Sequence, residues 1–290
     1  MLLTVDKYLA KSHRLQCRVL QETLDQRIDL WRRSSSRNSY STNHSDASLL
    51  IRRNIDKLDS CLQLASALEY VHSRNVVYRD LKPENVGFAP IPSPTNERGT
   101  NTNLQLFDFG LCRELTTTVT PLTGVTGTMR YMAPEDCLEL NYDCDCDIYS
   151  YAIVCWELWT HQIPFKTMTT PDLYREYVCR RGFRPYPDQY AQGNYSWHDS
   201  QHPLHHQRVP LQDQVQNQLP REMMVLLSQA WKHDPKSRIR WSQTKNQLAL
   251  LKQLAELQLE EHELSESSAD IDDFLVDDQH YHQNQRTWQH

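Results

Sequence analysis

Apolar residues recur at helical spacing along much of the chain, and the first such stretch covers residues 22–33. Leu24, Ile28 and Trp31 lie four and three residues apart, which places them on one face of a helix. Residues 55–72 repeat this spacing. Their apolar positions are Leu58, Cys61, Leu62, Ala65 and Leu68. The pattern therefore predicts two amphipathic helices, each with one face turned toward a core.

A different pattern covers residues 147–160, which read D-I-Y-S-Y-A-I-V-C-W-E-L-W-T and are apolar on nearly every side. A helix that is apolar all round is normally buried, so this stretch predicts a helix inside the core. Residues 219–231 and 241–259 predict two further helices, and residues 104–107 predict a short strand.

Four polar stretches interrupt these elements. Residues 34–48 are rich in Ser, Asn and Thr and predict a disordered loop. Residues 89–103 carry three prolines and predict an insertion within a hairpin. Residues 186–218 are rich in Gln, His and Pro and predict a mobile insertion, and residues 260–290 predict an acidic, then Gln- and His-rich, disordered tail.

Charge and hydrophobicity exclude two classes of protein. The 290 residues carry a net charge of −6 with no basic stripe, so we expect no nucleic-acid partner beyond a nucleotide. No stretch approaches the roughly 18 apolar residues that a membrane helix needs, so we expect no membrane partner. The chain also has no signal-peptide pattern, because Asp6 and Lys7 interrupt its start.

The eight cysteines are scattered and form no C-x-x-C pair, which predicts reduced thiols in a cytoplasmic or nuclear protein. Cys144 and Cys146 alternate with acids in a D-C-D-C-D run at residues 143–147. A metal site is one interpretation of this run. However, the run enters the predicted buried helix, so its consecutive residues cannot all face one ion. The clustered histidines at 202, 205 and 206 lie in a low-complexity stretch, which disfavours a specific metal site there.

Three motifs stand out against this background. The first reads V-Y-R-D-L-K-P-E-N at residues 77–85, the second D-F-G at 108–110, and the third A-P-E at 133–135. The second begins 23 residues after the end of the first, and the third begins 23 residues after the end of the second. In this order and spacing they resemble the catalytic loop, the metal-binding motif and the end of the activation segment of a eukaryotic protein kinase.

The resemblance implies a role for each polar residue of these motifs. Asp80 would accept the proton of a substrate hydroxyl, and Lys82 would contact the transferring phosphate. Asn85 and Asp108 would supply oxygen ligands to Mg²⁺, so ATP and Mg²⁺ are the implied cofactors. The alternative is that each is an ordinary turn residue, which four matched positions in order disfavour.

The activation segment carries further implied roles. Arg79 stands where such kinases pair an arginine with a phosphorylated segment. The threonines available here are Thr116, Thr117, Thr118, Thr120, Thr123, Thr126 and Thr128. One hypothesis is phosphorylation of an earlier threonine, and the other is that threonines are merely tolerated in a mobile loop. Thr128 would bond toward Asp80 and Lys82.

The resemblance also indicates a substrate class. The lysine within D-L-K-P-E-N is typical of serine/threonine kinases, as is the G-T-M-R-Y-M-A-P-E approach at residues 127–135. The predicted buried helix additionally resembles the tyrosine-kinase-like branch. The implied partners are therefore protein substrates with Ser or Thr hydroxyls.

Other matched residues would hold the site together. Tyr78 replaces the histidine usual in the catalytic loop, and its ring would stack beneath Phe109. Asp147 would anchor the backbone of the catalytic loop, and Arg238 would pair with Glu135 of A-P-E. Breaking a buried pair of that kind typically costs about 3–5 kcal/mol.

The small lobe of such a kinase is not found in the sequence. The first glycine is Gly87, so no G-x-G-x-x-G loop precedes the catalytic loop. Gly87 also stands where kinases have an apolar side chain under the adenine. We therefore expect an α+β, protein-kinase-like fold: a mainly helical large (C-terminal) lobe, with the β-rich small lobe largely absent. A partial kinase domain would cover residues 1–259. The disordered tail would cover residues 260–290.

Two functions from different classes follow. The first is a serine/threonine kinase domain that is truncated or incomplete in this chain. The second is a non-catalytic, pseudokinase-like module that binds or scaffolds other proteins. A lobe without its sheet would expose an apolar face for a protein partner to cover. The presence of both Asp80 and Asp108 favours the enzyme.

Overall fold

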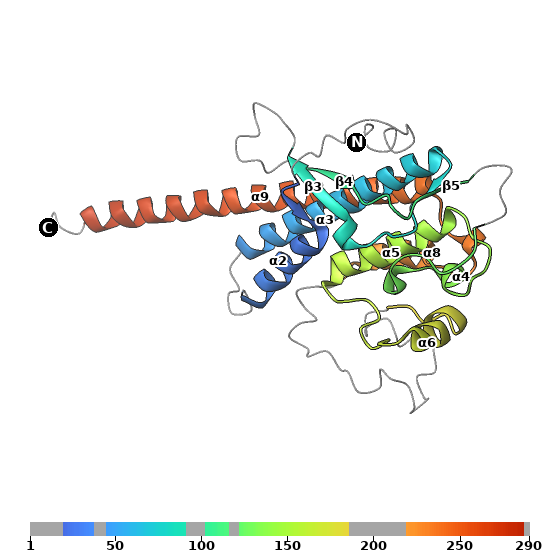
Figure 1. The fold of residues 1–290 in the computed structure, drawn as a ribbon. Coiled ribbons are helices and arrows are strands. Elements are labelled where there is room, and N and C mark those ends of the chain that lie inside the picture. The colour runs from blue at the N-terminus through green and yellow to red at the C-terminus, as the bar shows by residue number, and fades with distance from the viewer. Residues whose placement is uncertain (1–19, 38–44, 91–101, 116–121, 186–218, 287–290) are drawn as a thin grey trace.

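Helix α5 (Asp145–Thr160) lies at the centre of the fold, and every one of its residues is buried. This confirms the buried helix predicted from its all-round apolar sequence. The structure, a computed structural model, describes residues 20–37, 45–90, 102–115, 122–185 and 219–286. Within these ranges it is mainly helical with two small sheets (Figure 1), which confirms the predicted α+β class with a predominantly helical lobe.

The other long helices surround α5. They are α2 (Leu24–Arg37), α3 (Ser45–Ser73), α8 (Arg221–Ala230) and α9 (Trp241–Arg286). Their buried residues, among them Leu24, Ile28 and Leu68, form one core with α5. The apolar faces predicted for α2 and α3 therefore do face the core.

Helices α3 and α9 run side by side in opposite directions (Figure 1). Lys252 of α9 lies 2.6 Å from Asp59 of α3, and Lys245 pairs with Glu69 further along α3. The residue numbers of the partners rise on one helix as they fall on the other, which fixes the antiparallel arrangement.

Two small antiparallel sheets lie beside the helices. The first has the order β1 (Glu22–Thr23), β3 (Val86–Pro90), β4 (Thr102–Leu106), and the second pairs β2 (Val76–Val77) with β5 (Arg113–Glu114). The predicted strand over residues 104–107 is confirmed by β4. Residues 91–101, most of the predicted hairpin insertion, lie outside the described residues.

Short helical turns connect these elements. They are η1 (Pro83–Asn85), η2 (Met129–Tyr131), α4 (Pro134–Cys137), α6 (Pro171–Leu173), η3 (Tyr174–Arg180) and η5 (Pro235–Ser237). Four of these turns begin with proline, which suits the first helical position because its missing N–H would have no partner there. The predicted insertion at residues 186–218 lies outside the described residues.

Two sequence-based predictions are wrong. The loop expected over residues 34–48 is helical at both ends, since α2 continues to Arg37 and α3 begins at Ser45; residues 38–44 lie outside the described part. The disordered tail expected from residue 260 is helical to Arg286. Residues 241–286 contain neither glycine nor proline, so nothing in the sequence interrupts the helix. Acidic and Gln-rich composition alone therefore does not predict disorder in this segment.

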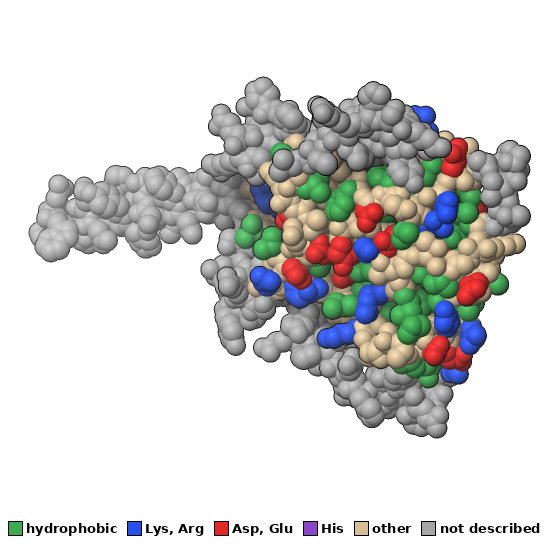
Figure 2. Space-filling view, in the orientation of Figure 1, with side chains coloured by type: hydrophobic (Ala, Val, Ile, Leu, Met, Phe, Trp, Pro, Cys, Tyr) green, Lys and Arg blue, Asp and Glu red, His purple; other side chains and the backbone are tan. Residues whose placement is uncertain are grey.

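The distribution of charged side chains on the surface agrees with the modest net charge of the chain. In Figure 2, acidic and basic side chains are interspersed on the visible face, and neither sign forms a continuous field. Among the described helices, none combines the length and apolar character needed to cross a bilayer.

Candidate active site

The β3–β4 hairpin brings two of the predicted site segments together. Val86 pairs with Leu106, so the residues on either side of this pair, Asn85 and Phe107, meet at the same end of the hairpin. The Phe107 amide donates to the Asn85 carbonyl at 3.2 Å. Asp108 follows at once, so the register of one hairpin positions the end of the 77–85 loop beside D-F-G.

Asp147, at the start of the buried helix, holds the backbone of the loop. Its Oδ2 accepts the Tyr78 amide at 2.7 Å, and its Oδ1 accepts the Arg79 amide at 2.8 Å. Asp147 is fully buried, and such charge-assisted bonds to a buried carboxylate are strong. The anchoring role expected for Asp147 is therefore seen in the structure.

Two further residues support Asp147. His72 Nε2 lies 2.8 Å from Asp147 Oδ2, and the Trp241 indole N–H donates to His72 Nδ1 at 2.8 Å. Because Nδ1 accepts from the indole, this bonding pattern assigns the imidazole proton to Nε2, which then donates to the carboxylate. No motif includes His72 or Trp241, since they meet only through the packing of α3 against α9.

Tyr78 connects the loop to the D-F-G segment. Its hydroxyl donates to the Phe107 carbonyl, and its ring meets the Phe109 ring edge-on, with centroids 5.5 Å apart at 83°. The predicted contact between Tyr78 and Phe109 is present, although the rings are perpendicular rather than stacked. Burial holds the pKa of the Tyr78 hydroxyl well above its usual value, so it remains a donor.

Asp80 lies at the centre of a hydrogen-bond network. Its Oδ1 accepts the Thr128 amide at 2.9 Å and the Thr128 hydroxyl at 2.7 Å. Its Oδ2 accepts Lys82 Nζ at 3.0 Å and Asn85 Nδ2 at 3.2 Å. Burial opposes ionisation of Asp80, but the bonds from Thr128 and Lys82 outweigh it, and the pKa falls below its ordinary value. Asp80 is therefore a carboxylate at neutral pH.

Gly127 places Thr128 against Asp80. Its φ is +105°, and a Cβ at this position would lie 2.3 Å from the Arg79 carbonyl oxygen. Only glycine fits there without moving the backbone. Lys82 Nζ also reaches the Thr128 hydroxyl at 3.2 Å, so the predicted contacts of Thr128 with Asp80 and Lys82 are both present.

Asn85 and Asp108 each offer oxygen donors of the kind that a hard cation takes. The Asn85 amide nitrogen donates to Asp80, through its carbonyl at 2.9 Å as well as its carboxylate, which leaves Asn85 Oδ1 as an acceptor. Asp108 is exposed, and its Oδ1 accepts only a 3.3 Å bond from the Gly110 amide among the bonds described. Carboxylate and amide oxygens are the ligands that Mg²⁺ prefers. These residues therefore fit the ion implied by the motifs.

Asp108 and Arg79 both have left-handed backbones, with φ of +57° and +71°. Such conformations cost of order 1–3 kcal/mol and cluster at functional sites. The Arg79 side chain donates to the Leu111 carbonyl at 2.6 Å and to the Tyr142 hydroxyl at 3.2 Å. It therefore binds a backbone carbonyl at the start of the predicted activation segment.

The threonines of that segment divide into two groups. Thr116, Thr117, Thr118 and Thr120 lie outside the described residues. Thr123 is exposed, and Thr126 is half-buried one residue before Gly127. Thr126 is thus placed beside the Asp80 network, but no hydrogen bond of its side chain is among those described.

Arg238 and Glu135 form a buried bidentate pair, as predicted. Arg238 Nη1 lies 2.5 Å from Glu135 Oε1, and Nη2 lies 2.8 Å from Oε2. Two further donors of Arg238 reach backbone carbonyls, of Asp145 at 2.7 Å and of Lys232 at 3.0 Å. The pair thus ties the A-P-E motif to the start of α5 and to the segment after α8.

The three aspartates of the D-C-D-C-D run make two kinds of contact, ion pairs and bonds to the loop backbone. Asp143 and Asp145 both pair with Lys236, at 2.5 and 2.9 Å, and Asp145 also pairs with Arg240 at 2.9 Å. Asp147 binds the loop backbone. Two of the carboxylates therefore share Lys236, whereas the third faces the loop backbone, so the three do not converge on one point.

Leu20 and Phe107 occupy the space beside Gly87. A Cβ on Gly87 would lie 2.7 Å from Leu20 Cδ1 and 3.1 Å from Phe107 Cε1. Leu20 precedes β1, which pairs with β3 through Thr23 and Gly87. The apolar side chain that kinases have at this position is missing, and apolar atoms from elsewhere in the chain fill the space beside Gly87.

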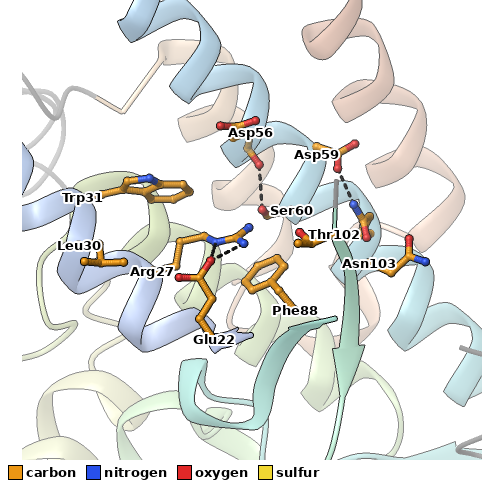
Figure 3. A pocket seen from close by; sticks show the side chains of 11 residues that line it. Glu22, Arg27, Leu30, Trp31, Asp56, Asp59, Ser60, Phe88, Thr102 and Asn103 are labelled. Carbon is orange, nitrogen blue, oxygen red and sulfur yellow. Dashed lines mark hydrogen bonds and ion pairs between the residues drawn. The ribbon is translucent and has the colours of Figure 1, made fainter. Parts of the chain in front are cut away.

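A separate cavity of about 450 Å³ opens between α2, α3 and the hairpin (Figure 3). Its walls include Trp31 and Phe88, and the Arg27 guanidinium lies 3.4 Å from the centre of the Phe88 ring. Arg27 also pairs with Glu22 at 2.5 Å. None of the predicted site residues lines this cavity, so it is distinct from the Asp80 centre.

Comparison with known proteins agrees with this geometry. The family model of the protein kinase domain matches residues 42–249, more than half of the chain. A putative mitogen-activated protein kinase kinase kinase 7-like protein of Drosophila melanogaster is 38% identical over 113 residues, covering 38% of this chain and 26% of the relative. The serine/threonine-protein kinases TIO of Arabidopsis thaliana and unc-51 of Caenorhabditis elegans are 35% and 34% identical over 44% and 43% of this chain. The matches span only 9% and 14% of those two relatives.

Proposed function

The chain belongs to the protein kinase family, and we propose that it transfers the γ-phosphoryl group of ATP to serine or threonine hydroxyls of proteins. One observation carries the proposal: the Asp80 carboxylate is held by Lys82, Asn85 and Thr128 at one end of the hairpin that also carries Asp108. Phosphoryl transfer depends mainly on positioning and charge neutralisation, which such a network provides.

Asp80 would serve as the base. Its lowered pKa keeps it ionised, and it already accepts a hydroxyl, that of Thr128, at 2.7 Å. A general base must lie within about 2.6–3.2 Å of the group whose proton it takes. A substrate hydroxyl that takes a similar position relative to Asp80 would therefore be oriented for attack.

Lys82 would contact the phosphoryl group, because its ammonium already sits between Asp80 and Thr128. Asn85 Oδ1 and the exposed Asp108 carboxylate would hold Mg²⁺. When bound, Mg·ATP supplies the phosphoryl group and the charge that neutralises it. The lysine of D-L-K-P-E-N and the names of the relatives support Ser and Thr over Tyr as the accepting residues.

The test is phosphoryl transfer by the full chain. The chain would be incubated with Mg²⁺, γ-labelled ATP and casein, and the labelled amino acids identified. We expect label on Ser or Thr and a loss of about 10²–10⁴-fold in Asp80→Asn, the range by which general bases accelerate reactions. Melting temperatures of both proteins would be compared, because Asp80 also accepts four hydrogen bonds.

A non-catalytic binding module is the second candidate, and one observation favours it. Leu20 fills the space beside Gly87, where kinases have an apolar side chain under the adenine. A protein partner covering this face would then be the functional ligand. Absence of label transfer from a folded chain would overturn the catalytic proposal and support the binding module.

A further inference from the structure

Helix α9 has two apolar faces, and the core accounts for only one of them. Leu248 and Ala255 are buried, and half-buried Leu251 packs against the same core. These residues face α3, the helix with which α9 has its most extensive contact. A helix that lies on the surface of a domain normally has polar residues on its other face.

The other face of α9 instead has a row of exposed leucines. Leu250, Leu254, Leu257 and Leu264 have 57%, 48%, 48% and 70% of their surfaces exposed. At about 100° per residue they fall within an arc of about 80°, whose centre is about 130° around the helix from the core-facing residues. We call these four residues the leucine seam.

Over about two heptads, the spacing of the seam matches that of a coiled coil. Successive members are four, three and seven residues apart, the alternation by which apolar residues follow a heptad repeat. A heptad row fits a second helix, because each side chain can enter a hole between four side chains of the partner. A flat or irregular binding surface would not require this regularity.

Helix α9 also extends beyond the body to which it is attached (Figure 1). Its 46 residues span about 69 Å. The pairs Lys245–Glu69, Lys252–Asp59 and Arg52–Glu263 fix its register against α3. Continued to Ser45, the first residue of α3, this register ends near position 268, so the remaining residues of α9 to Arg286 have no α3 beside them.

The charges near the seam specify the kind of helix that fits. Residues 250–265 contain four glutamates and one lysine. The lysine, Lys252, faces Asp59 of α3, and Glu263 pairs with Arg52 of α3. Glu260 and Glu261 are exposed, and Glu261 falls within the arc of the seam between Leu257 and Leu264.

A second copy of this chain in a parallel arrangement is disfavoured by these same charges. A parallel pair of α9 helices would bring Glu261 against Glu261 in the apolar interface, and like charges in such positions are destabilising. A helix with lysine or arginine at the facing positions would instead pair with Glu260 and Glu261. Electrostatic complementarity of this kind selects partners.

We propose that the leucine seam of α9 is the docking surface for a helix of another protein, an amphipathic helix with an apolar heptad row flanked by lysine or arginine. The chain would then dock its partner at a surface separate from the Asp80 centre.

The test uses synthetic peptides of about four heptads, because isolated helices shorter than about 12–15 residues are marginal in water. One has leucine at the a and d positions with lysine on both flanks, one has glutamate on both flanks, and one is a scrambled version of the lysine peptide. Binding to the full chain is measured by fluorescence anisotropy. We expect the lysine peptide to bind at least about tenfold more tightly than the others, which corresponds to about 1.4 kcal/mol.

Matched variants locate the contact. Leu254→Gln with Leu257→Gln should weaken the lysine peptide at least about tenfold, whereas Val225→Gln should not, since Val225 is a 49% exposed apolar residue on α8. Glu260→Lys with Glu261→Lys should reduce the preference for the lysine peptide. Equal binding of all three peptides, or no effect of the seam variant, would overturn the proposal. A dimer in sedimentation velocity that the seam variant abolishes would also overturn it, in favour of a second copy.

Discussion

Replacing Gly127 by alanine tests how the activation segment is joined to Asp80. The new Cβ would lie 2.3 Å from the Arg79 carbonyl oxygen, at a backbone φ of +105°. Gly124 offers a matched control three residues earlier. Its φ is +93°, and a Cβ there would meet no atom within 4 Å. The two alanines therefore share an unfavourable backbone conformation, but only one of them also collides with the loop.

The difference between the variants can be estimated. A positive φ costs an alanine about 1–2 kcal/mol, which is the loss expected for Gly124→Ala. In Gly127→Ala the backbone must also move away from Arg79, which loosens the two bonds from Thr128 to Asp80. Hydrogen bonds to a charged group contribute about 1.5–3 kcal/mol each. Losing one or both adds about 1.5–6 kcal/mol.

Two measurements check this estimate. Urea unfolding should show a larger loss of stability for Gly127→Ala than for Gly124→Ala. Carbon-13 NMR should show the pKa of Asp80 rising toward its ordinary value in Gly127→Ala alone, because the Thr128 bonds that lower it are weakened. Equal losses in the two variants, with an unchanged Asp80 pKa, would refute the role assigned to Gly127.

Three further predictions concern buried polar groups. Arg238→Ala should destabilise the fold by about 3–5 kcal/mol, because it leaves the Glu135 carboxylate buried without its partner; equal urea midpoints for variant and parent would contradict the ion pair. Tyr78→Phe removes the hydroxyl bond to the Phe107 carbonyl and should lower stability by about 0.5–1.5 kcal/mol, and an unchanged unfolding curve would show that this bond is not formed. Burial and the neighbouring Glu135 raise the pKa of Asp136 to about 8 from 3.8, so the folded state holds the extra proton and stability should fall as pH rises from about 4 to about 8. Asp136→Asn should remove this slope and melt above the parent at high pH, whereas parallel melting curves across that range would argue against a buried acid.

Much of the site could be predicted because its residues lie in short motifs. Asp80, Lys82 and Asn85 fall within six residues of the chain, so their grouping depends on local backbone rather than on the whole fold. The positions of Asp147 and Arg238 relative to those motifs predicted their roles. Each contacts the partner that was expected, the loop backbone for Asp147 and Glu135 for Arg238. Helix α5 was predicted because a helix that is apolar on every side fits only a core.

Other features depend on contacts between distant parts of the chain, which the sequence does not reveal. His72 supports Asp147 only because Trp241 packs against it from α9. Leu20 covers Gly87 only because β1 pairs with β3. The end of a helix depends on residues that interrupt it, such as glycine and proline, and not on overall composition. Residues 260–286 are acidic and Gln-rich, but they contain neither glycine nor proline, so α9 continues through them.

The most direct test of the proposed function is magnesium-dependent ATP binding to the full chain, measured as a thermal shift. Asp108→Asn is a suitable control, because the side chain is exposed and asparagine tolerates a φ of +57°. A ligand that binds only the folded state adds about 2.7 kcal/mol at 100 times its dissociation constant. We predict a rise in melting temperature with Mg·ATP that disappears without Mg²⁺ and in Asp108→Asn. No shift at saturating ATP, or an equal shift in the variant, would contradict an ATP and metal site built from these residues.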